Sequence, residues 1–140
     1  GVATAIRSLS PTTRIWSAEP ATHDDTRRSL EKGEPVANAA DARSICDAIV
    51  TPTPGKLTFP INKALLAGGL AVSDDEVLAA VAFSLDTLKL VVEPGAAVAL
   101  AAVLAGKLPT QGRRIAVVMS GGNVDFPMLA RAKGYASAAG

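Results

Sequence analysis

The amino-acid sequence predicts an α/β fold in which parallel strands are flanked by helices. Two observations support this prediction. Segments with apolar residues at helical spacing alternate along the chain with short, β-rich apolar segments. In addition, residues 114–119 (RIAVVM) form a continuous apolar run, which is typical of a strand buried on both faces of a parallel sheet.

The composition is that of one folded domain. The chain has 140 residues, 49% of them hydrophobic, and a formal net charge of +1. This apolar fraction argues against intrinsic disorder, and the near-zero charge indicates neither a nucleic-acid nor a membrane surface. The uncharged run 95–105 is too short to span a bilayer. Cys46 is the only cysteine, so no internal disulfide can form and we expect a reducing, cytoplasmic location.

The first part of the chain contains two predicted helices and one strand. A helix begins at Val2 and ends before Pro11, and the short β-rich segment 14–18 (RIWSA) follows it as a strand. Asp24 is placed to cap a second helix, and Gly33 supplies the C-terminal stop of that helix.

The middle of the chain is richer in loop signals. Residues 34–57 contain many Pro, Thr, Gly and small side chains, and we expect a loop there with at most one short helix over 40–49. A helix over 60–67 follows, with a proline in its first turn. A Gly-Gly pair is expected to end this helix before a short strand over 70–72.

Four further elements complete the prediction. Ser73 and Glu76 form a capping box for the helix that follows them. A second helix over 95–105 lacks a polar face, so we expect it to be buried on every side. The predicted strand RIAVVM then runs into a glycine-rich turn, and a last helix begins near Pro127.

The turn after this strand, residues 119–125 (MSGGNVD), contains side chains placed for a ligand. Ligands of open α/β sheets bind beyond the carboxyl ends of the strands, and two glycines allow a flat molecule to approach the backbone. Ser120 would present a hydroxyl there and Asn123 an amide. The alternative is an ordinary turn in which Asn123 or Asp125 caps the last helix, and the spacing alone does not decide between the two.

Two acidic segments allow two interpretations each. Glu93 lies between an apolar run and a helix start, where a carboxylate either faces a ligand or, as the pattern favours, caps the helix. Glu19, His23 and Asp25 could ligate Mg²⁺ or Ca²⁺ around a turn, although a solvated acidic loop is the simpler interpretation. His23 is the only histidine, and no nucleophile motif lies near it, which gives a hydrolase triad little support.

Taken together, these segments resemble the fold-type II pyridoxal-phosphate (PLP) enzymes, and most closely the threonine/serine dehydratase (ammonia-lyase) and serine racemase group. The resemblance covers nearly the whole chain in order. Its most specific part is the turn SGGNVD after an apolar strand, preceded by an EPG helix start. The matching stretches are SAEPATHDD (17–25), SICDAI (44–49), LAVSDDEV (70–77), LKLVVEPGAAVALAAVLAGK (88–107) and VVMSGGNVD (117–125).

The resemblance implies that residues 1–140 form the C-terminal part of the large domain of a tryptophan synthase β-like enzyme. In this family the Schiff-base lysine and the glycine-rich phosphate loop precede this region, so the expected partner is an N-terminal part of the same enzyme. Gly1 matches the end of that phosphate loop, at the N-terminus of a helix. No lysine of this chain matches the Schiff-base position, so we expect no catalytic residue in this segment.

The resemblance also implies roles for the candidate residues. Ser120 matches the serine that hydrogen-bonds the pyridine nitrogen of PLP, and Gly121 and Asn123 belong to the same turn. Glu93 matches an acid close to the cofactor ring. Asp47 matches the aspartate of an active-site loop, although the family's usual glycine after it is alanine here.

The implied metal site uses the acidic segment described above. Several relatives bind Mg²⁺ or Ca²⁺ through a glutamate, a backbone carbonyl and an aspartate in this order. Glu19, the carbonyl of His23 and Asp25 match these ligands, which makes the metal site and the solvated loop equally supported interpretations.

The implied reaction is a PLP-dependent β-elimination that converts a hydroxy amino acid, such as L-threonine or L-serine, to a 2-oxo acid and ammonia. Loss of the Cα proton and of the β-hydroxyl suits a cofactor whose ring nitrogen faces a serine. The alternatives are a serine racemase, a lyase for hydroxyectoine-type substrates, and a catalytically inactive fragment or pairing module. Because members of the family are commonly dimers, we also expect a homodimer.

Overall fold

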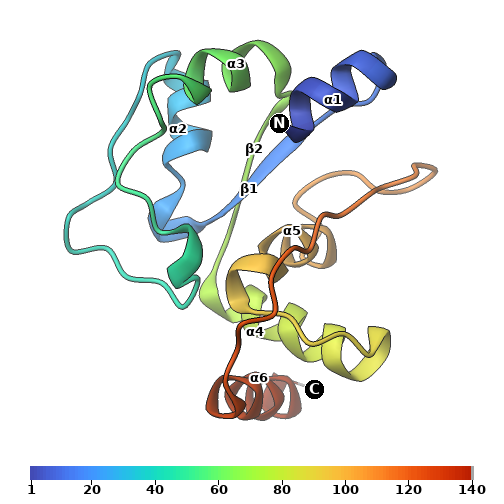
Figure 1. Cartoon of the computed structure of the whole chain (residues 1–140). Coiled ribbons are helices and arrows are strands. Elements are labelled where there is room, and N and C mark those ends of the chain that lie inside the picture. Colours follow the sequence, from blue (N-terminus) through green and yellow to red (C-terminus); the bar gives the residue numbers. More distant parts are fainter. Residues whose placement is uncertain (140) are drawn as a thin grey trace.

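A computed structural model describes residues 1–139 and shows an α/β arrangement (Figure 1). The predicted fold class is therefore confirmed. The first half of the chain consists of α1 (Val2–Leu9), β1 (Trp16–Pro20), the single turn η1 (Ala21–His23), α2 (Asp25–Lys32), the single turn η2 (Asp47–Ile49), α3 (Thr58–Leu65) and β2 (Gly68–Val72). The second half consists of α4 (Asp74–Phe83), the π-helical turn η3 (Ser84–Leu88), α5 (Pro94–Leu104) and α6 (Phe126–Ala139).

The two strands are parallel neighbours at the centre of the structure. Their register pairs Trp16 with Gly68 and Pro20 with Val72. Figure 1 shows α2 and α5 on opposite sides of this pair, and both helices contact both strands. The carboxyl ends of β1 and β2 therefore lie at the same edge, where ligand sites of parallel sheets are built.

The glycine pair before β2 belongs to the strand, so its prediction as a helix stop was wrong. α3 already ends at Leu65, and both glycines pair with β1. A Cβ atom at Gly69 would lie 2.7 Å from the Cα atom of Arg27, and one at Gly68 would lie 2.6 Å from the ring of Trp16. Glycine is required here because α2 and the Trp16 ring occupy the space that side chains would fill.

The core lies between the strands and the helices of the second half. α4 begins with the predicted capping box, in which Ser73 and Glu76 exchange side-chain and backbone hydrogen bonds. α5 is buried through Ala102, as its uniform apolar sequence predicts, but Leu104 at its end is exposed. α6 packs against α4 and contributes the buried Ala132. Among residues 1–139, no helix is long and apolar enough to cross a membrane.

The predicted strand over 114–119 is wrong for the described structure. This segment has no strand hydrogen bonds, and 60% of the surface of Val118 is exposed, whereas Val117 and Met119 pack against the core. A strand needs a neighbour for its backbone groups, and within residues 1–139 only β1 and β2 pair. The predicted short helix over 40–49 is likewise reduced to the one turn of η2.

Candidate functional site

The glycine-rich turn and Glu93 lie together, although 30 residues separate Glu93 from Asn123. Glu93 immediately precedes α5, and its backbone N–H donates a hydrogen bond to the carbonyl of Gly121 at 3.2 Å. In return, the N–H of Asn123 donates to Oε2 of Glu93 at 3.0 Å. Glu93 is the N-cap residue of α5, as the favoured interpretation expects, but its side chain caps no N–H group of the helix.

The two glycines of the turn allow this close contact. A Cβ atom at Gly121 would lie 2.6 Å from Oε1 of Glu93, and Gly121 has a φ of +141°. A Cβ atom at Gly122 would lie 3.1 Å from the carbonyl oxygen of Val91. Any larger residue at Gly121 would thus meet both a clash and an unfavourable backbone conformation.

The turn also leaves two polar side chains free to meet a ligand. Ser120 and Asn123 are both exposed, and neither side chain makes a hydrogen bond within residues 1–139. Asp125, in contrast, accepts a hydrogen bond from the N–H of Met128 at 2.8 Å and so caps α6. Asp125 is therefore the helix cap, whereas Ser120 and Asn123 remain the candidates for ligand binding.

Asp47 lies on a loop that contacts the start of α5. It is exposed in the turn η2, and the two residues after it pack against the beginning of α5. A Cβ atom at Gly95 would lie 3.6 Å from Cβ of Ala48 and 3.7 Å from the side chain of Ile49. The loop of Asp47 and the segment of Glu93 thus meet at the first turn of α5.

The predicted phosphate end of the site, Gly1, is the N-cap residue of α1. Its carbonyl accepts the first backbone hydrogen bond of the helix, from Ala5 at 3.0 Å. The N–H groups of residues 2–4 therefore point beyond the helix, and no acidic residue lies in the first turn. Such a helix end favours an anion.

The candidate metal ligands are placed around the start of α2. Both oxygens of Glu19 accept backbone hydrogen bonds, from Thr26 at 3.0 Å and from Arg27 at 2.9 Å. Burial raises the pKa of Glu19, although these hydrogen bonds act in the opposite direction. Asp25 is buried and accepts a hydrogen bond from Nδ2 of Asn38 at 2.7 Å.

Within residues 1–139, no three side chains of His, Cys, Asp or Glu gather as a metal site would require. A site that uses the backbone carbonyl of His23 does not need such a group, so the metal site stays a prediction. The imidazole of His23 is itself buried and shares a hydrogen bond with the hydroxyl of Thr22 at 3.0 Å.

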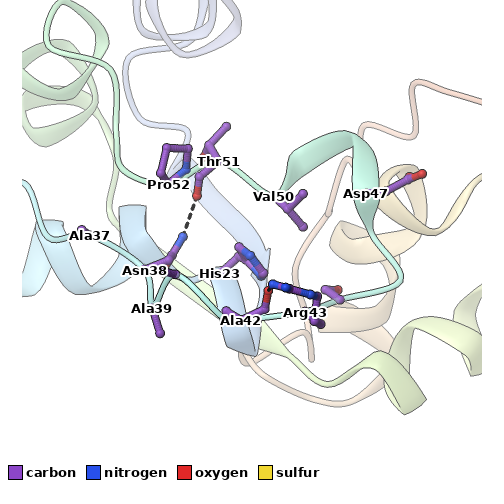
Figure 2. Close-up of a pocket in the computed structure, with 12 residues that line it drawn as sticks. His23, Ala37, Asn38, Ala39, Ala42, Arg43, Asp47, Val50, Thr51 and Pro52 are labelled. Carbon is purple, nitrogen blue, oxygen red and sulfur yellow. Dashed lines mark hydrogen bonds between the residues drawn. The ribbon is translucent and has the colours of Figure 1, made fainter.

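A pocket of about 510 Å³ lies beside His23 (Figure 2). The segment 37–52 forms most of its wall. The two ends of this segment are joined by a hydrogen bond of 2.7 Å from Nδ2 of Asn38 to the carbonyl of Thr51. Asp47 lies at the edge of the pocket. The residues that line it do not include Glu93 or the turn 119–125, so this pocket is distinct from their contact.

Comparison with known proteins identifies the family. Residues 1–121 match the model of the family described as pyridoxal-phosphate dependent enzyme. The chain belongs to this family. The resemblance inferred from the sequence is thereby confirmed.

Relatives within the family act on small amino acids, as their names state. The chain is 35% identical to serine racemase of Rattus norvegicus, over 95% of this chain and 40% of that protein. It is 34% identical to L-threonine ammonia-lyase of Thermotoga maritima, over 94% of this chain and 32% of that protein. The chain thus spans less than half the length of these relatives.

Solved structures agree with this assignment. Serine racemase from Dictyostelium discoideum superposes with a TM-score of 0.80 and 35% identity, covering 89% of this chain and 40% of that one. Threonine deaminase isoform 2 from Solanum lycopersicum superposes with a TM-score of 0.84 and 26% identity, covering 98% of this chain and 38% of that one. The arrangement of strands and helices is therefore that of fold-type II PLP enzymes.

The residues of the glycine-rich turn fit the cofactor of this family. The exposed hydroxyl of Ser120 has no partner within residues 1–139 and could meet a ring nitrogen. The glycine at 121 lets the carboxylate of Glu93 lie where a side chain at that position would be. The free N–H groups after Gly1 suit a phosphate.

Proposed function

We propose that the complete protein uses PLP to eliminate the β-hydroxyl of a hydroxy amino acid, such as L-threonine or L-serine, as water. The released enamine then takes up water and yields a 2-oxo acid and ammonia. The observation that supports this most is the contact between Glu93 and the turn 120–123, because it joins the two segments that the resemblance places at the cofactor. When bound, PLP withdraws electrons from the Cα atom of an amino acid.

In this proposal Ser120 binds the ring nitrogen. Its hydroxyl is neutral, so it can hydrogen-bond the ring nitrogen without keeping that nitrogen protonated. An aspartate in the same place would keep it protonated. A cofactor in that state stabilises negative charge less strongly, which favours a substrate that quickly expels a β-hydroxyl. Glu93 positions Ser120 indirectly, because its carboxylate holds the backbone of the same turn at Asn123.

We further propose that residues 1–140 are the C-terminal part of the large PLP domain, and that an N-terminal part supplies the Schiff-base lysine and the phosphate loop. The short coverage of the relatives supports this. So do the exposed apolar side chains of Val91 and Val118, which are 54% and 60% accessible. These side chains lie on the segments that adjoin the turn, where the rest of a sheet would cover them.

The lysines of this chain support the same division. Five of the six contact a carbonyl or a carboxylate, as Lys89 does at 2.6 Å from the carbonyl of Asp86. Lys56 lies exposed in the loop before α3. Within residues 1–139, no lysine side chain makes a hydrogen bond or an ion pair with the turn 120–123.

Serine racemase is the second candidate function, because several relatives bear that name at 34–36% identity. Other parts of the proposal rest on the sequence and on the resemblance. They are a Mg²⁺ or Ca²⁺ ion held by Glu19, the carbonyl of His23 and Asp25, a homodimeric state and a cytoplasmic location. If the complete protein shows no activity on any substrate, the remaining alternative is a pairing module without activity.

The proposal is tested by assaying the complete protein with L-threonine, L-serine, D-serine and hydroxyectoine. We expect a 2-oxo acid and ammonia from at least one of them, and D-serine formation from L-serine would favour the racemase. Ser120→Ala is expected to weaken PLP binding without unfolding the protein, because the side chain is exposed. The isolated chain of 140 residues should show no borohydride-sensitive PLP absorbance band, and such a band would overturn the proposed division.

A further inference from the structure

We propose that Asp74 is a positioning residue that holds the loop 44–49, and with it Asp47, against α4 and α5. The inference rests on the proposed function, because it concerns the loop that the family resemblance places at the active site. The sequence alone indicates only that Asp74 lies in the first turn of a helix.

Both carboxylate oxygens of Asp74 are used by the loop. Oδ1 accepts a hydrogen bond from the hydroxyl of Ser44 at 2.7 Å, and Oδ2 accepts one from the N–H of Ile45 at 3.1 Å. These residues lie 30 and 29 positions away in the sequence. Hydrogen bonds to a charged group are roughly twice as strong as those between neutral groups, so this pair is a strong connection.

The connection continues into the loop through Ser44. The oxygen of its hydroxyl also accepts a hydrogen bond from the N–H of Cys46 at 3.1 Å. Cys46 is fully buried in the core, and the turn η2 with Asp47 begins directly after it. A loop that is tied at residues 44–46 leaves Asp47 little freedom.

The other side of the loop rests on α5. Ala48 and Ile49 lie in ordinary van der Waals contact with the position that a Cβ atom of Gly95 would take. Gly95 is two residues after Glu93. The loop is therefore held between the start of α4, through Asp74, and the start of α5, beside the acid that contacts the glycine-rich turn.

Asp74 is not needed to cap its own helix. The capping box of α4 is made by Ser73 and Glu76, and the first turn contains a second aspartate, Asp75, which is exposed. Both aspartates interact with the helix dipole, but only Asp74 reaches the loop. Asp75 therefore provides a matched control for every effect of charge at this helix end.

The experiment uses the complete protein and compares Asp74→Asn with Asp75→Asn. The rate at which the Cys46 thiol is labelled, located by mass spectrometry, reports how often the loop opens. We expect Asp74→Asn to raise this rate about tenfold, because a partly buried charge-assisted connection is lost, and Asp75→Asn to leave it unchanged. Ser44→Ala removes the hydroxyl bond to Asp74 and leaves the bond from the N–H of Ile45, so it should act in the same direction, less strongly, even if Asp74→Asn fails to fold.

Catalysis separates positioning from stability. At a temperature well below the thermal midpoints of both variants, we expect Asp74→Asn to lower kcat/KM for the preferred hydroxy amino acid about tenfold relative to Asp75→Asn. Equal labelling in Asp74→Asn, Ser44→Ala and the unchanged protein would overturn the inference, as would an equal rise in Asp75→Asn. Unchanged kcat/KM in a variant with a loosened loop would overturn the positioning role. If the unchanged protein had no activity on any substrate, the proposed function would fail, whereas labelling would still judge the connection.

Discussion

Glu93 and Asn123 are joined by a hydrogen bond of 3.0 Å from the backbone of the asparagine to the carboxylate of the glutamate. The N–H of Glu93 returns a bond to the carbonyl of Gly121 at 3.2 Å. Two short segments on either side of α5 are thus closed onto each other. Because the bonds to Glu93 go through backbone atoms, the side chains of Ser120 and Asn123 stay available to a ligand.

The substitution Gly121→Ala is expected to open this contact. The new methyl group would lie 2.6 Å from Oε1 of Glu93, and a φ of +141° is unfavourable for any residue with a Cβ atom. Backbone strain of this kind costs on the order of 1–3 kcal/mol, and displacement of Glu93 adds to it. We expect a lower free energy of unfolding by denaturant and weaker binding of PLP to the complete protein.

Gly112→Ala is the matched control. Gly112 also has a positive φ, +71°, but nothing lies within 4 Å of the position of its Cβ atom. This variant should lose only about 1 kcal/mol and bind PLP normally. Equal losses of PLP affinity in the two variants would show that the contact with Glu93 does not shape the site.

Two substitutions distinguish the role of the Glu93 carboxylate as a hydrogen-bond acceptor from the role of its charge. Glu93→Ala removes the acceptor for the N–H of Asn123, and we expect hydrogen exchange at that amide to accelerate about tenfold. Glu93→Gln keeps one carbonyl oxygen, so the amide should stay protected. Exchange that is slow in both variants would contradict the role of Glu93 in holding the turn.

The sequence predicted best the features that depend on neighbouring residues. The capping box of Ser73 and Glu76 and the helix stop at Gly33, with a φ of +82°, formed as predicted because the groups involved lie within one turn. The glycine pair of β2 was mistaken for a second helix stop. Glycine is needed at these two positions because Arg27 and Trp16, which come from elsewhere in the sequence, lie where side chains would be.

The candidate site was predicted in part. Glu93 and the SGGN turn could be singled out by resemblance, but no local signal shows that they bond each other across 30 residues. At α2, Asp24 was the expected cap. It occupies the N-cap position without making a side-chain cap, and the partly buried Glu19 accepts the backbone hydrogen bonds instead. Because Glu19 lies on the preceding strand and not at the usual cap position, no sequence pattern of helix capping could predict its role.

The strand predicted over 114–119 shows the limit of apolar patterns. Its sequence is suited to burial, yet burial depends on what lies beside it. In the described structure Val117 and Met119 face the core while Val118 is exposed. A pattern predicts what a segment can do, and its neighbours decide whether backbone hydrogen bonds complete it.

Cys46 should be almost unreactive in the folded protein. Burial raises the pKa of its thiol to about 11. At pH 8 only about one thiol in a thousand is then the reactive thiolate, and the side chain is also inaccessible. We expect labelling by iodoacetamide to be slow in the native protein and to reach the rate of a free cysteine in denaturant.

The same shift predicts an alkaline effect on stability. A thiol whose pKa is raised in the folded state stays protonated there while the unfolded chain already ionises. The free energy of unfolding should therefore fall as the pH rises from about 9 toward 11, and Cys46→Ala should remove this slope. Native labelling as fast as labelling of the unfolded chain would contradict the buried position of Cys46.

Asp24 is expected to make the fold sensitive to acid. Burial alone would raise the pKa of Asp24, but hydrogen bonds from Arg28 and Arg27 outweigh it, and the pKa lies below its ordinary value of 3.8. Arg28 Nε lies 2.7 Å from Oδ1, and Arg27 Nε lies 2.8 Å from Oδ2. Because the folded state binds the proton less tightly, the stabilisation is complete above pH 3.8 and is lost as the pH falls through the lowered value.

Asp24→Asn tests this relationship through the thermal midpoint measured between pH 2 and pH 7. The loss of the charge should cost about 1–3 kcal/mol near neutral pH, and the difference from the unchanged protein should shrink in strong acid, where both side chains are neutral. Asp41→Asn is the control, because Asp41 is exposed and makes no side-chain hydrogen bond within residues 1–139. A deficit in Asp24→Asn that stays constant across the whole range would show that its packing, and not its charge on Arg27 and Arg28, stabilises α2.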